Sequence, residues 1–394
     1  MQTPTVNEKV QPEARIRHLR PADLERRPEV GALLERLGLG KFEPDGLMAY
    51  RGRNDNWAGR TTNGDRVFVK CVGGGGRESS LESLQRFRRI LACERLVGND
   101  FAVGVARPRC LGWDESSRLV AFEWLEDAET GAEMAAADSF RDAAIAGRMI
   151  GQLHEAKVGN GEWIDNSPHP LPPTRNFQAL SLSAFMRACA AELEAWRLLQ
   201  GDEQLIEALE TLRTSEQRAE HRPVHGDLRL DQFLMDDGDL YLIDWEEFRQ
   251  ADPARDLGGF AGEWLYRAIL GSVPGEEGAE RLATGQFPTA HDEIMANGVR
   301  EFERLRPNIT AFWNGYRQAR ERVAAEDPEL AQRATAFAGW HLIDRLLAAA
   351  VERPRLSGLE RAMAGIGRSA LVSPNEFTGV LGFRDESEEA ANAG

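Results

Sequence analysis

Apolar residues recur along the chain with two different periods, which predict where strands and helices lie. The β-rich segments are residues 67–72, 109–112 and 119–125. The segments with a helical period are residues 21–37, 78–97, 139–155, 180–220, 255–271 and 289–353. One helical stripe is predicted to be buried in the core: Phe185, Cys189, Leu193, Trp196 and Leu199. The pattern therefore predicts an α+β protein, with its strands mainly in the first third of the chain and helices dominating the rest.

A β-hairpin is predicted at residues 232–243, where two apolar runs flank the turn Asp236-Asp237-Gly238-Asp239. Asp and Gly tolerate the positive φ that tight hairpin turns need. Asp227 comes just before the first strand, and Asp244 directly follows the second. Because an antiparallel hairpin brings its outer ends side by side, the two carboxylates are predicted to meet.

Composition and charge narrow the class of protein. The 394 residues are 42% hydrophobic and 28% charged, which is typical of a soluble globular protein large enough for two lobes. A formal net charge of −16 argues against a nucleic-acid-binding surface. The four cysteines lack the spacing of a zinc site or a disulfide framework. No segment has the length of a membrane span and residues 1–20 lack a signal-peptide core, so a cytoplasmic protein is expected.

Three motifs around the predicted hairpin resemble those of the aminoglycoside phosphotransferase and choline kinase family. They are His225-Gly226-Asp227-Leu228, Ile243-Asp244-Trp245-Glu246 and Asp252-Pro253-Ala254-Arg255-Asp256-Leu257. The resemblance implies a two-lobed, protein-kinase-like fold, with a small antiparallel-sheet N-lobe and a larger, mainly helical C-lobe. The implied activity is phosphoryl transfer from ATP to an alcohol, with Mg²⁺ as the second cofactor.

The resemblance also implies roles for residues of the C-lobe. Asp227 would orient the acceptor hydroxyl and accept its proton, and Asp244 would bind Mg²⁺. Arg229 stands two residues after Asp227, where a guanidinium could reach the γ-phosphate. Gln232 takes the place of the metal-binding Asn of the family, and its amide oxygen could still bind Mg²⁺. His225 and His154 are expected to be structural, and Asp256 is expected to support the catalytic loop.

In the N-lobe, the resemblance assigns nucleotide binding to a strand, a helix and a hinge. Lys70, on the strand at residues 67–72, would pair with the α- and β-phosphates. A glutamate of the following helix would hold Lys70 in place, with Glu94 preferred over Glu78 and Glu82. The backbone from Glu123 to Leu125 would bind the edge of the adenine.

Domain boundaries follow from the same resemblance. We expect a flexible leader at residues 1–20, the N-lobe at residues 21–125, the C-lobe with the acceptor site at residues 126–379, and an acidic tail at residues 380–394.

The acceptor is open to more than one interpretation. The run from His225 to Leu234, together with the loop at residues 51–59, resembles the kinase subunits of class V lanthipeptide biosynthesis. That resemblance implies phosphorylation of Ser and Thr in a precursor peptide, with a lyase as partner protein. One alternative is a small-molecule kinase for an aminoglycoside, choline or another amino alcohol or sugar. The other is a pseudokinase, a binding module without catalysis.

Overall fold

The computed structural model describes residues 24–51, 53–75, 79–99, 104–159, 163–170, 172–272, 291–321, 323–351 and 353–383. The chain divides into two compact units. Unit 1 comprises residues up to Glu94 together with Arg107–Ala128, and unit 2 comprises Arg95–Ala106 and Glu129 onward. The predicted leader at residues 1–20 lies outside the described residues, as does most of the predicted acidic tail.

Unit 1 is built on one antiparallel sheet of five strands, in the order β1-β2-β3-β5-β4. Its strands are β1 (Met48–Arg51), β2 (Asp55–Arg60), β3 (Arg66–Cys71), β4 (Cys110–Asp114) and β5 (Leu119–Glu123). The turn between β2 and β3 contains Gly64 at a φ of 84°, a left-handed conformation that glycine adopts without steric penalty. The predicted strands at residues 67–72, 109–112 and 119–125 are thereby confirmed, with small shifts at their ends.

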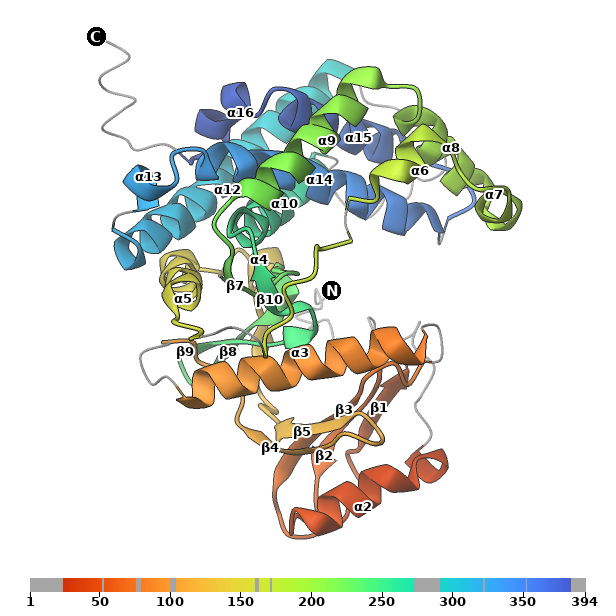
Figure 1. Ribbon diagram of the computed structural model, residues 1–394, viewed down its shortest axis with the longest axis vertical. Helices are drawn as coiled ribbons and strands as arrows, with labels where there is room; N and C mark the ends of the chain where they lie inside the picture. Colours follow the sequence, from red (N-terminus) through yellow and green to blue (C-terminus); the bar gives the residue numbers. More distant parts are fainter. Residues whose placement is uncertain are drawn as a thin grey trace, which may run out of the picture. The chain divides into compact units, whose positions relative to one another are not determined.

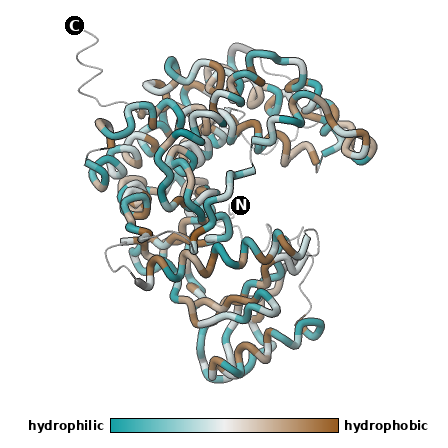
Figure 2. The backbone as a smooth tube through the Cα atoms, viewed as in Figure 1, coloured by the Kyte–Doolittle hydropathy of each residue, from teal (hydrophilic) through white to brown (hydrophobic). Residues whose placement is uncertain are grey.

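Two helices cover the two faces of this sheet (Figure 1). They are α2 (Pro28–Arg36), preceded by the short η1 (Leu24–Arg26), and α3 (Ser80–Asn99). Val30 and Leu34 of α2 pack against Val69, while Phe87 of α3 packs against Val120. Hydrophobic residues accordingly recur along the strands and along both helices (Figure 2). Because side chains alternate along a strand, Lys70 of β3 points to the α3 side of the sheet.

Unit 2 is mainly helical (Figure 1). Its longer helices are α5 (Ala143–Glu155), α8 (Ala190–Leu199), α9 (Glu203–Arg218), α10 (Ala254–Gly271), α12 (His291–Ala319), α14 (Leu330–Val351) and α15 (Gly358–Val372). Its shorter helices are α4 (Gly131–Ala136), α6 (Thr174–Gln178), α7 (Leu182–Arg187), α13 (Val323–Glu326) and α16 (Pro374–Leu381).

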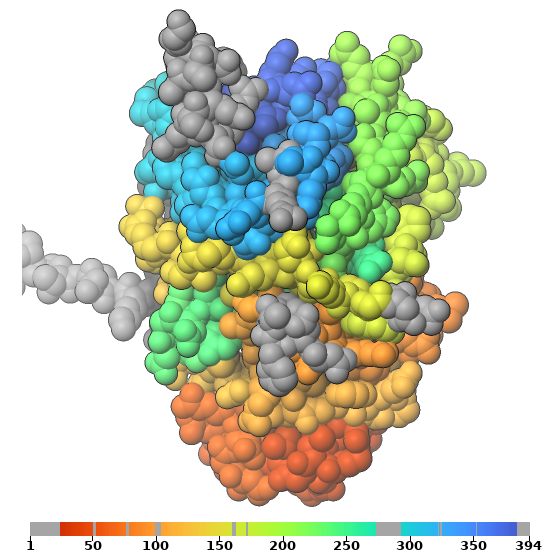
Figure 3. All heavy atoms as spheres, turned by 60° about the vertical axis from the view of Figure 1, so that its left-hand side comes forward, coloured from red at the N-terminus to blue at the C-terminus, as the bar shows by residue number. Residues whose placement is uncertain are grey.

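Close helix contacts form the centre of unit 2. Helix α5 lies directly against α12 (Figure 3), and a Cβ at Gly147 would overlap the Phe312 carbonyl oxygen. The α10 residue Phe260 stacks on Phe312 with ring centroids 3.9 Å apart. Helix α10 also packs along α14. Together α5, α10, α12 and α14 form the scaffold that carries the predicted catalytic segment.

The predicted catalytic hairpin is confirmed. Strands β8 (Phe233–Asp236) and β9 (Asp239–Leu242) pair antiparallel, with Phe233 opposite Leu242. The turn residues Asp237 and Gly238 have φ angles of 49° and 87°, as a two-residue hairpin turn requires. The other short elements of this region are β6 (Glu129–Thr130), β7 (Arg222–Val224), η2 (Leu230–Gln232), η3 (Trp245–Glu247) and β10 (Arg249–Ala251). Strand β6 extends the hairpin to three strands, and β7 pairs with β10.

The α+β, two-lobed, kinase-like fold predicted from the sequence is confirmed, but the prediction for residues 180–220 was partly wrong. That segment forms three helices, α7, α8 and α9, and Phe185 of α7 is 52% exposed and does not belong to the core. None of the helices in the described ranges combines the length and apolar character that a membrane span requires.

Candidate active site

Asp244, the predicted metal ligand, follows the end of β9, and Asp227, the predicted base, lies on the loop that precedes β8. The Gln232 carbonyl accepts from the Ile243 N–H at 2.9 Å, so pairing continues one residue beyond the strands. His225 Nε2 lies 2.9 Å from the Ile243 carbonyl oxygen, which fixes the start of the catalytic loop beside the residue that precedes Asp244. Asp244 itself has a φ of 69°, an unusual conformation for a residue other than glycine and one that clusters at functional sites.

Asp227 has the electrostatic environment of a general base. Its side chain is 44% exposed, so solvent and an acceptor can reach it. Desolvation by the surrounding loop raises the pKa of Asp227 to about 6, Arg229 and His225 oppose this shift, and Asp244 adds to it. The contribution of Asp244 supports the prediction that the hairpin brings the two carboxylates together. A carboxylate with this pKa remains ionised at neutral pH while being more basic than an ordinary Asp.

Arg229 lies between two acids of the catalytic loop. One terminal nitrogen of its guanidinium, Nη2, is 3.6 Å from Asp227 Oδ2, and its Nε is 3.3 Å from Asp231 Oδ1. Burial alone would lower the pKa of Arg229, but these acids, with Glu263 and Asp244, raise it above its usual value. Arg229 therefore places a permanent positive charge directly beside Asp227.

Asp256 anchors the backbone of the catalytic loop, as the sequence predicts. Its Oδ2 accepts from the His225 N–H at 2.8 Å, and its Oδ1 accepts from the Gly226 N–H at 2.9 Å. His154 Nε2 lies 3.0 Å from Asp256 Oδ2, and both side chains are fully buried. Burial alone would raise the pKa of Asp256, but the contacts with His154, His225 and Gly226 hold it below its usual value. His154 is thus structural, as predicted.

A second buried acid holds the start of α10. Asp252 binds Arg333 of α14 through both carboxylate oxygens, at 2.7 and 3.0 Å, and accepts from the Ala254 N–H at 3.0 Å. Arg333 also donates to Asp327 at 2.9 and 2.7 Å. A bidentate pair of this kind fixes direction as well as distance. The start of α10 is therefore tied to α14 through the buried side chain of Asp252.

In unit 1, Lys70 is the fifth of the six residues of β3. In the sheet, Lys70 is paired with Asn56 of β2 on one side and with Val120 of β5 on the other, and only 8% of the residue is exposed. An ammonium on a strand is a group that could bind a nucleotide phosphate. The role predicted for Lys70 in binding phosphates stays a prediction.

Among the three glutamates considered for Lys70, Glu94 has another partner. Its Oε2 accepts from Arg107 at 2.7 Å, and burial raises the pKa of Glu94 against the opposing effect of Arg107. Glu82 accepts from the N–H and the hydroxyl of Ser79 at the start of α3, at 3.0 and 2.9 Å. Glu78 lies outside the described residues. Which glutamate holds Lys70 therefore stays open.

Backbone hydrogen bonds at the end of β5 reduce the number of N–H groups that could contact the adenine. The Glu123 N–H donates to the Arg109 carbonyl at 2.9 Å, and the Trp124 N–H donates to the Arg66 carbonyl at 3.1 Å. The Leu125 N–H has no acceptor among the described residues. Within residues 123–125, Leu125 is thus the residue whose N–H remains available to an adenine ring.

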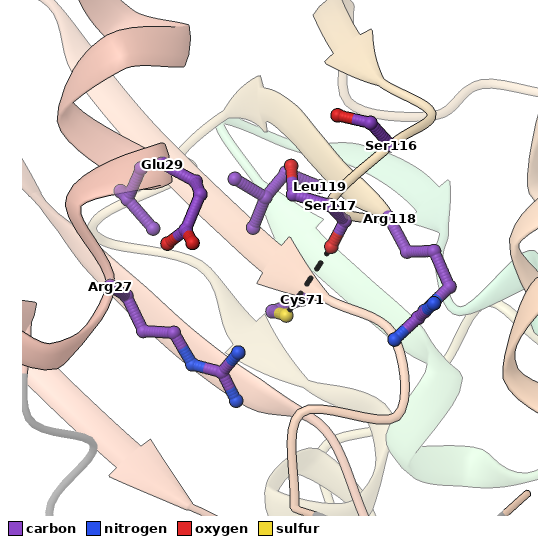
Figure 4. A pocket seen from close by; sticks show the side chains of 8 residues that line it. Arg27, Glu29, Cys71, Ser116, Ser117, Arg118 and Leu119 are labelled. Carbon is purple, nitrogen blue, oxygen red and sulfur yellow. Dashed lines mark hydrogen bonds between the residues drawn. The ribbon is translucent and has the colours of Figure 1, made fainter. Parts of the chain in front are cut away.

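A cavity of about 310 Å³ in unit 1 is separate from these residues. Figure 4 shows Arg27 and Arg118 on opposite sides of the Cys71 thiol, which contacts the Ser117 carbonyl at 3.8 Å. Burial raises the pKa of the Cys71 thiol, so this group is protonated and a poor nucleophile. Cys71 follows Lys70 in β3, and its side chain therefore points to the opposite face of the sheet.

Comparison with known proteins decides the family. A model of the phosphotransferase enzyme family matches residues 51–296, more than half of the chain. The chain belongs to this phosphotransferase family. The match includes Lys70, the catalytic loop and Asp256, and it confirms the family indicated by the three motifs. A search of curated proteins found no significant match.

Several solved structures resemble this phosphotransferase at low sequence identity. A putative fructosamine-3-kinase from Thermobifida fusca is 18% identical, with coverage of 86% of this chain and 99% of its own and a TM-score of 0.46. A glucosamine kinase is 16% identical, with coverage of 91% and 86% and a TM-score of 0.46. The choline kinase LicA from Streptococcus pneumoniae is 16% identical, with coverage of 89% and 99% and a TM-score of 0.40.

ATP and a divalent metal ion are the cofactors of this chemistry, and the donor groups of the phosphotransferase fit a magnesium ion. Asp244 offers a carboxylate and Gln232 an amide oxygen, and both residues lie at the open end of one hairpin. No group of three or more His, Cys, Asp or Glu that could hold a metal occurs among the described residues. One carboxylate with one amide oxygen suits Mg²⁺, which is usually held by one or two carboxylates and completed by phosphates and water.

The sequence analysis missed a polar group beyond the catalytic loop. His341 Nε2 lies 2.8 Å from Glu263 Oε1, and Arg345 follows one turn later on α14. The charge of Arg345 acts on both Asp227 and Glu263. Glu263 lies on α10, whereas His341 and Arg345 lie on α14. The two helices are far apart in the sequence, so no local motif marks these residues.

Proposed function

We propose that this chain transfers the γ-phosphoryl group of ATP to an acceptor hydroxyl bound at Asp227. The observation that carries the proposal is the hairpin itself. It places Asp227 within the electrostatic reach of Asp244, on a loop whose backbone N–H groups are fixed by Asp256. Phosphoryl transfer requires little covalent work from the protein, so catalysis depends mainly on positioning and charge.

In the proposed reaction, Asp227 accepts a hydrogen bond from the acceptor hydroxyl and orients its oxygen toward the γ-phosphorus. That oxygen forms a new P–O bond as the bond to the bridging β–γ oxygen breaks, and ADP leaves with the bonding electron pair. The hydroxyl proton passes to Asp227, whose pKa of about 6 leaves it ionised before the reaction. Arg229, 3.6 Å from Asp227, offsets negative charge on the phosphoryl group.

The remaining predicted residues would hold the nucleotide. Lys70 would bind the α- and β-phosphates, the Leu125 N–H would donate to the adenine, and Asp244 with Gln232 would hold Mg²⁺. The ion, when bound, neutralises charge on the β- and γ-phosphates. Gln232 is one methylene longer than Asn, so its oxygen reaches about 1.5 Å further. Gln232 would therefore still offer an amide oxygen to Mg²⁺.

For the acceptor, we place Ser and Thr side chains of a precursor peptide first, with a lyase as the partner that acts on the phosphorylated product. The support is the sequence of the catalytic loop, which resembles that of the lanthipeptide kinases. A small-molecule alcohol is the second candidate. The solved structures described above are, by their names, kinases of fructosamine (putative), glucosamine and choline.

The test is incubation with γ-labelled ATP and Mg²⁺ in the presence of three acceptor groups: a Ser- and Thr-containing peptide encoded near this chain, amino alcohols, and aminosugars. We expect labelled acceptor with the wild type and none with Asp227→Asn. Label in the peptide supports the first acceptor, and label in small molecules alone contradicts it. A protein that neither binds ATP nor consumes it with any acceptor would be a pseudokinase, and the proposed function would fail.

A further inference from the structure

Helices α10 and α14 run in the same direction, and their register can be followed from one contact to the next. A Cβ at Gly258 would overlap Phe337 Cβ, and a Cβ at Gly262 would lie 2.6 Å from His341 Cβ. Advancing four residues on α10 therefore corresponds to advancing four on α14 between these two contacts. The next turn of each helix brings Tyr266 of α10 level with Arg345 of α14.

The face of α10 that carries Gly259 contacts the catalytic loop. A Cβ at Gly259 would lie 2.7 Å from the Leu228 carbonyl oxygen, so α10 touches the loop between Asp227 and Arg229. Residues four and seven positions later share this face of the helix, and they are Glu263 and Tyr266. The α10–α14 pair thus leads from the general base to Tyr266 and Arg345.

Glu263 already has a partner on this path. Its carboxylate accepts from His341 at 2.8 Å, and both residues are about nine-tenths buried. Burial alone would raise the pKa of Glu263, but the contact with His341 and the nearby arginines, Arg345 and Arg229, lower it to about 2. Glu263 is therefore a permanent, compensated carboxylate and a poor binding site for a further cation.

Arg345 and Tyr266 are much less satisfied. Among the described residues, the only hydrogen-bond partner of the Arg345 guanidinium is Asp344 Oδ2, at the long distance of 3.5 Å. Its Nε is buried without a partner, while the side chain remains 25% exposed. The Tyr266 hydroxyl has no hydrogen-bond partner among the described residues, although the ring is half-buried. The buried Nε–H of Arg345 is unfavourable unless water or a ligand pairs with it, and the exposed donors are open to a ligand.

We propose that Arg345 and Tyr266 bind an anionic group, in the first place a carboxylate, that the acceptor carries near the hydroxyl to be phosphorylated. This inference rests on the proposed function and specifies its substrate class. Arg presents parallel N–H donors that match the two oxygens of a carboxylate, and a neighbouring phenol can donate a third hydrogen bond. The electrostatic influence of Arg345 on Asp227 places this anion site close enough to the general base to serve one small acceptor.

Net charge and the local charge near Asp227 favour different acceptors, cationic in the first case and anionic in the second. With −16 overall, the chain would attract cationic acceptors at long range. Near Asp227, however, Arg229 and Arg345 contribute two positive charges, and the negative charge of Glu263 is already offset by its contact with His341. We therefore expect hydroxy acids, or peptides with an acidic residue next to Ser or Thr, to be better acceptors than their uncharged or cationic counterparts.

Matched acceptors test this directly. The small-molecule arm compares 3-hydroxybutyrate and 4-hydroxybutyrate with their primary amides. The peptide arm compares two tetrapeptides that differ only by Asp or Asn after a Ser. We measure KM and kcat for phosphoryl transfer, and by calorimetry the Kd of each compound without ATP. The variants are Arg345→Met, Arg345→Lys and Tyr266→Phe, and Arg300→Met is the control because the Arg300 guanidinium contacts only Asn297 among the described residues.

We expect the wild type to prefer each acid to its amide in at least one arm, which then identifies the source of the carboxylate. Arg345→Met should raise KM and Kd for the acids by about 10- to 100-fold and leave the amides unchanged, since a hydrogen bond to a charged group is lost. Arg345→Lys should restore part of the binding, Tyr266→Phe should weaken it less, and Arg300→Met should have no effect.

An equal effect of Arg345→Met on acids and amides would overturn the inference, because it would show that Arg345 only balances local charge. Phosphorylation of amides or amino alcohols in preference to acids would overturn it as well, while leaving the proposed function intact. Acids that bind in an Arg345-dependent manner but receive no phosphate, while another acceptor does, would also overturn the inference, because the anion site would not serve the acceptor. If acids neither bind nor react, the inference fails.

Discussion

Lys70 is predicted to bind ATP and Asp227 to bind the acceptor hydroxyl, and the two residues are held in place by different means. Lys70 lies on the central strand of a sheet, between two paired strands and above an apolar core that contains Val69. Asp227 lies on a loop without ladder pairing of its own. The loop depends on Asp256 for two of its N–H groups, and Asp252 ties the next segment to Arg333.

This difference has an energetic consequence. A strand receives its position from the backbone ladder, so a single side chain next to Lys70 contributes mainly its own buried area. A loop held by buried carboxylates depends on each of them, because removal of one partner leaves a charge or an N–H group unpaired in the interior. We therefore expect substitutions around Asp227 to be more damaging than substitutions of similar size around Lys70.

The largest effect on stability is expected from Arg333→Met. The change leaves the fully buried Asp252 without its bidentate partner, and breaking a buried pair costs about 3–5 kcal/mol in the free energy of unfolding. Urea denaturation measures this loss. The double variant Arg333→Met/Asp252→Leu serves as the control and should recover part of it, because no unpaired charge remains. A loss below about 1 kcal/mol for Arg333→Met, within the range of exposed pairs, would contradict the importance of the pair.

Lys70→Met is expected to weaken ATP binding and to preserve the fold. Loss of a charge-assisted bond to phosphate costs about 1.5–3 kcal/mol, or roughly 10- to 150-fold in Kd. Calorimetric titration with a non-hydrolysable ATP analogue measures the change, and Lys41→Met, which removes an exposed lysine paired with Glu35, is the control. Unchanged affinity for Lys70→Met would remove Lys70 from the nucleotide site.

Asp256→Asn should destabilise the protein in a pH-dependent manner. One of the two loop N–H groups loses its acceptor, at a cost of about 1–3 kcal/mol. Because the folded-state pKa of Asp256 lies below its unfolded value near 3.8, its ionised form stabilises the protein fully above that value. This contribution is lost as pH falls through the lower, folded-state pKa.

The difference in unfolding free energy between wild type and Asp256→Asn should accordingly be constant from pH 5 to 7 and shrink below pH 4. A difference that grows on acidification would contradict the sign of the pKa shift. Asp237→Asn, at the hairpin turn, is the matched control, because Asn also tolerates the positive φ at this position.

The smallest effect is expected from Val69→Ala, next to Lys70. The substitution removes two buried carbon groups from a fully buried side chain, worth about 1.6 kcal/mol. Ladder pairing of β3 does not depend on the side chain, so nucleotide affinity should be unchanged. If Val69→Ala weakened ATP binding as much as Lys70→Met, the sheet would not be the rigid support described here.

Local sequence patterns were sufficient for the hairpin and for most of the secondary structure. Turn residues and alternating apolar positions act over a few residues, so they were sufficient to predict β8, β9 and β3. Periodicity was insufficient at α7, where Phe185 fits a helical stripe but is 52% exposed. A stripe predicts which side chains share a face, not whether another element packs on that face.

Contacts between distant segments could not be predicted in the same way. The partner of Glu94 is Arg107, and no spacing rule connects them. The alignment of Tyr266 with Arg345 depends on the glycine contacts between α10 and α14, which fix the register of the two helices. The side chains proposed to select the acceptor therefore emerged only from the packed structure.

The most direct test of the central claim, that Asp227 accepts the proton of the acceptor hydroxyl, is the single-turnover rate of phosphoryl transfer by Asp227→Asn at saturating ATP and Mg²⁺, with the best acceptor of the wild type. Loss of a general base predicts a fall of about 10²- to 10⁴-fold with unchanged nucleotide affinity. A rate within about threefold of the wild type, a difference of under 1 kcal/mol in the barrier, would contradict the account.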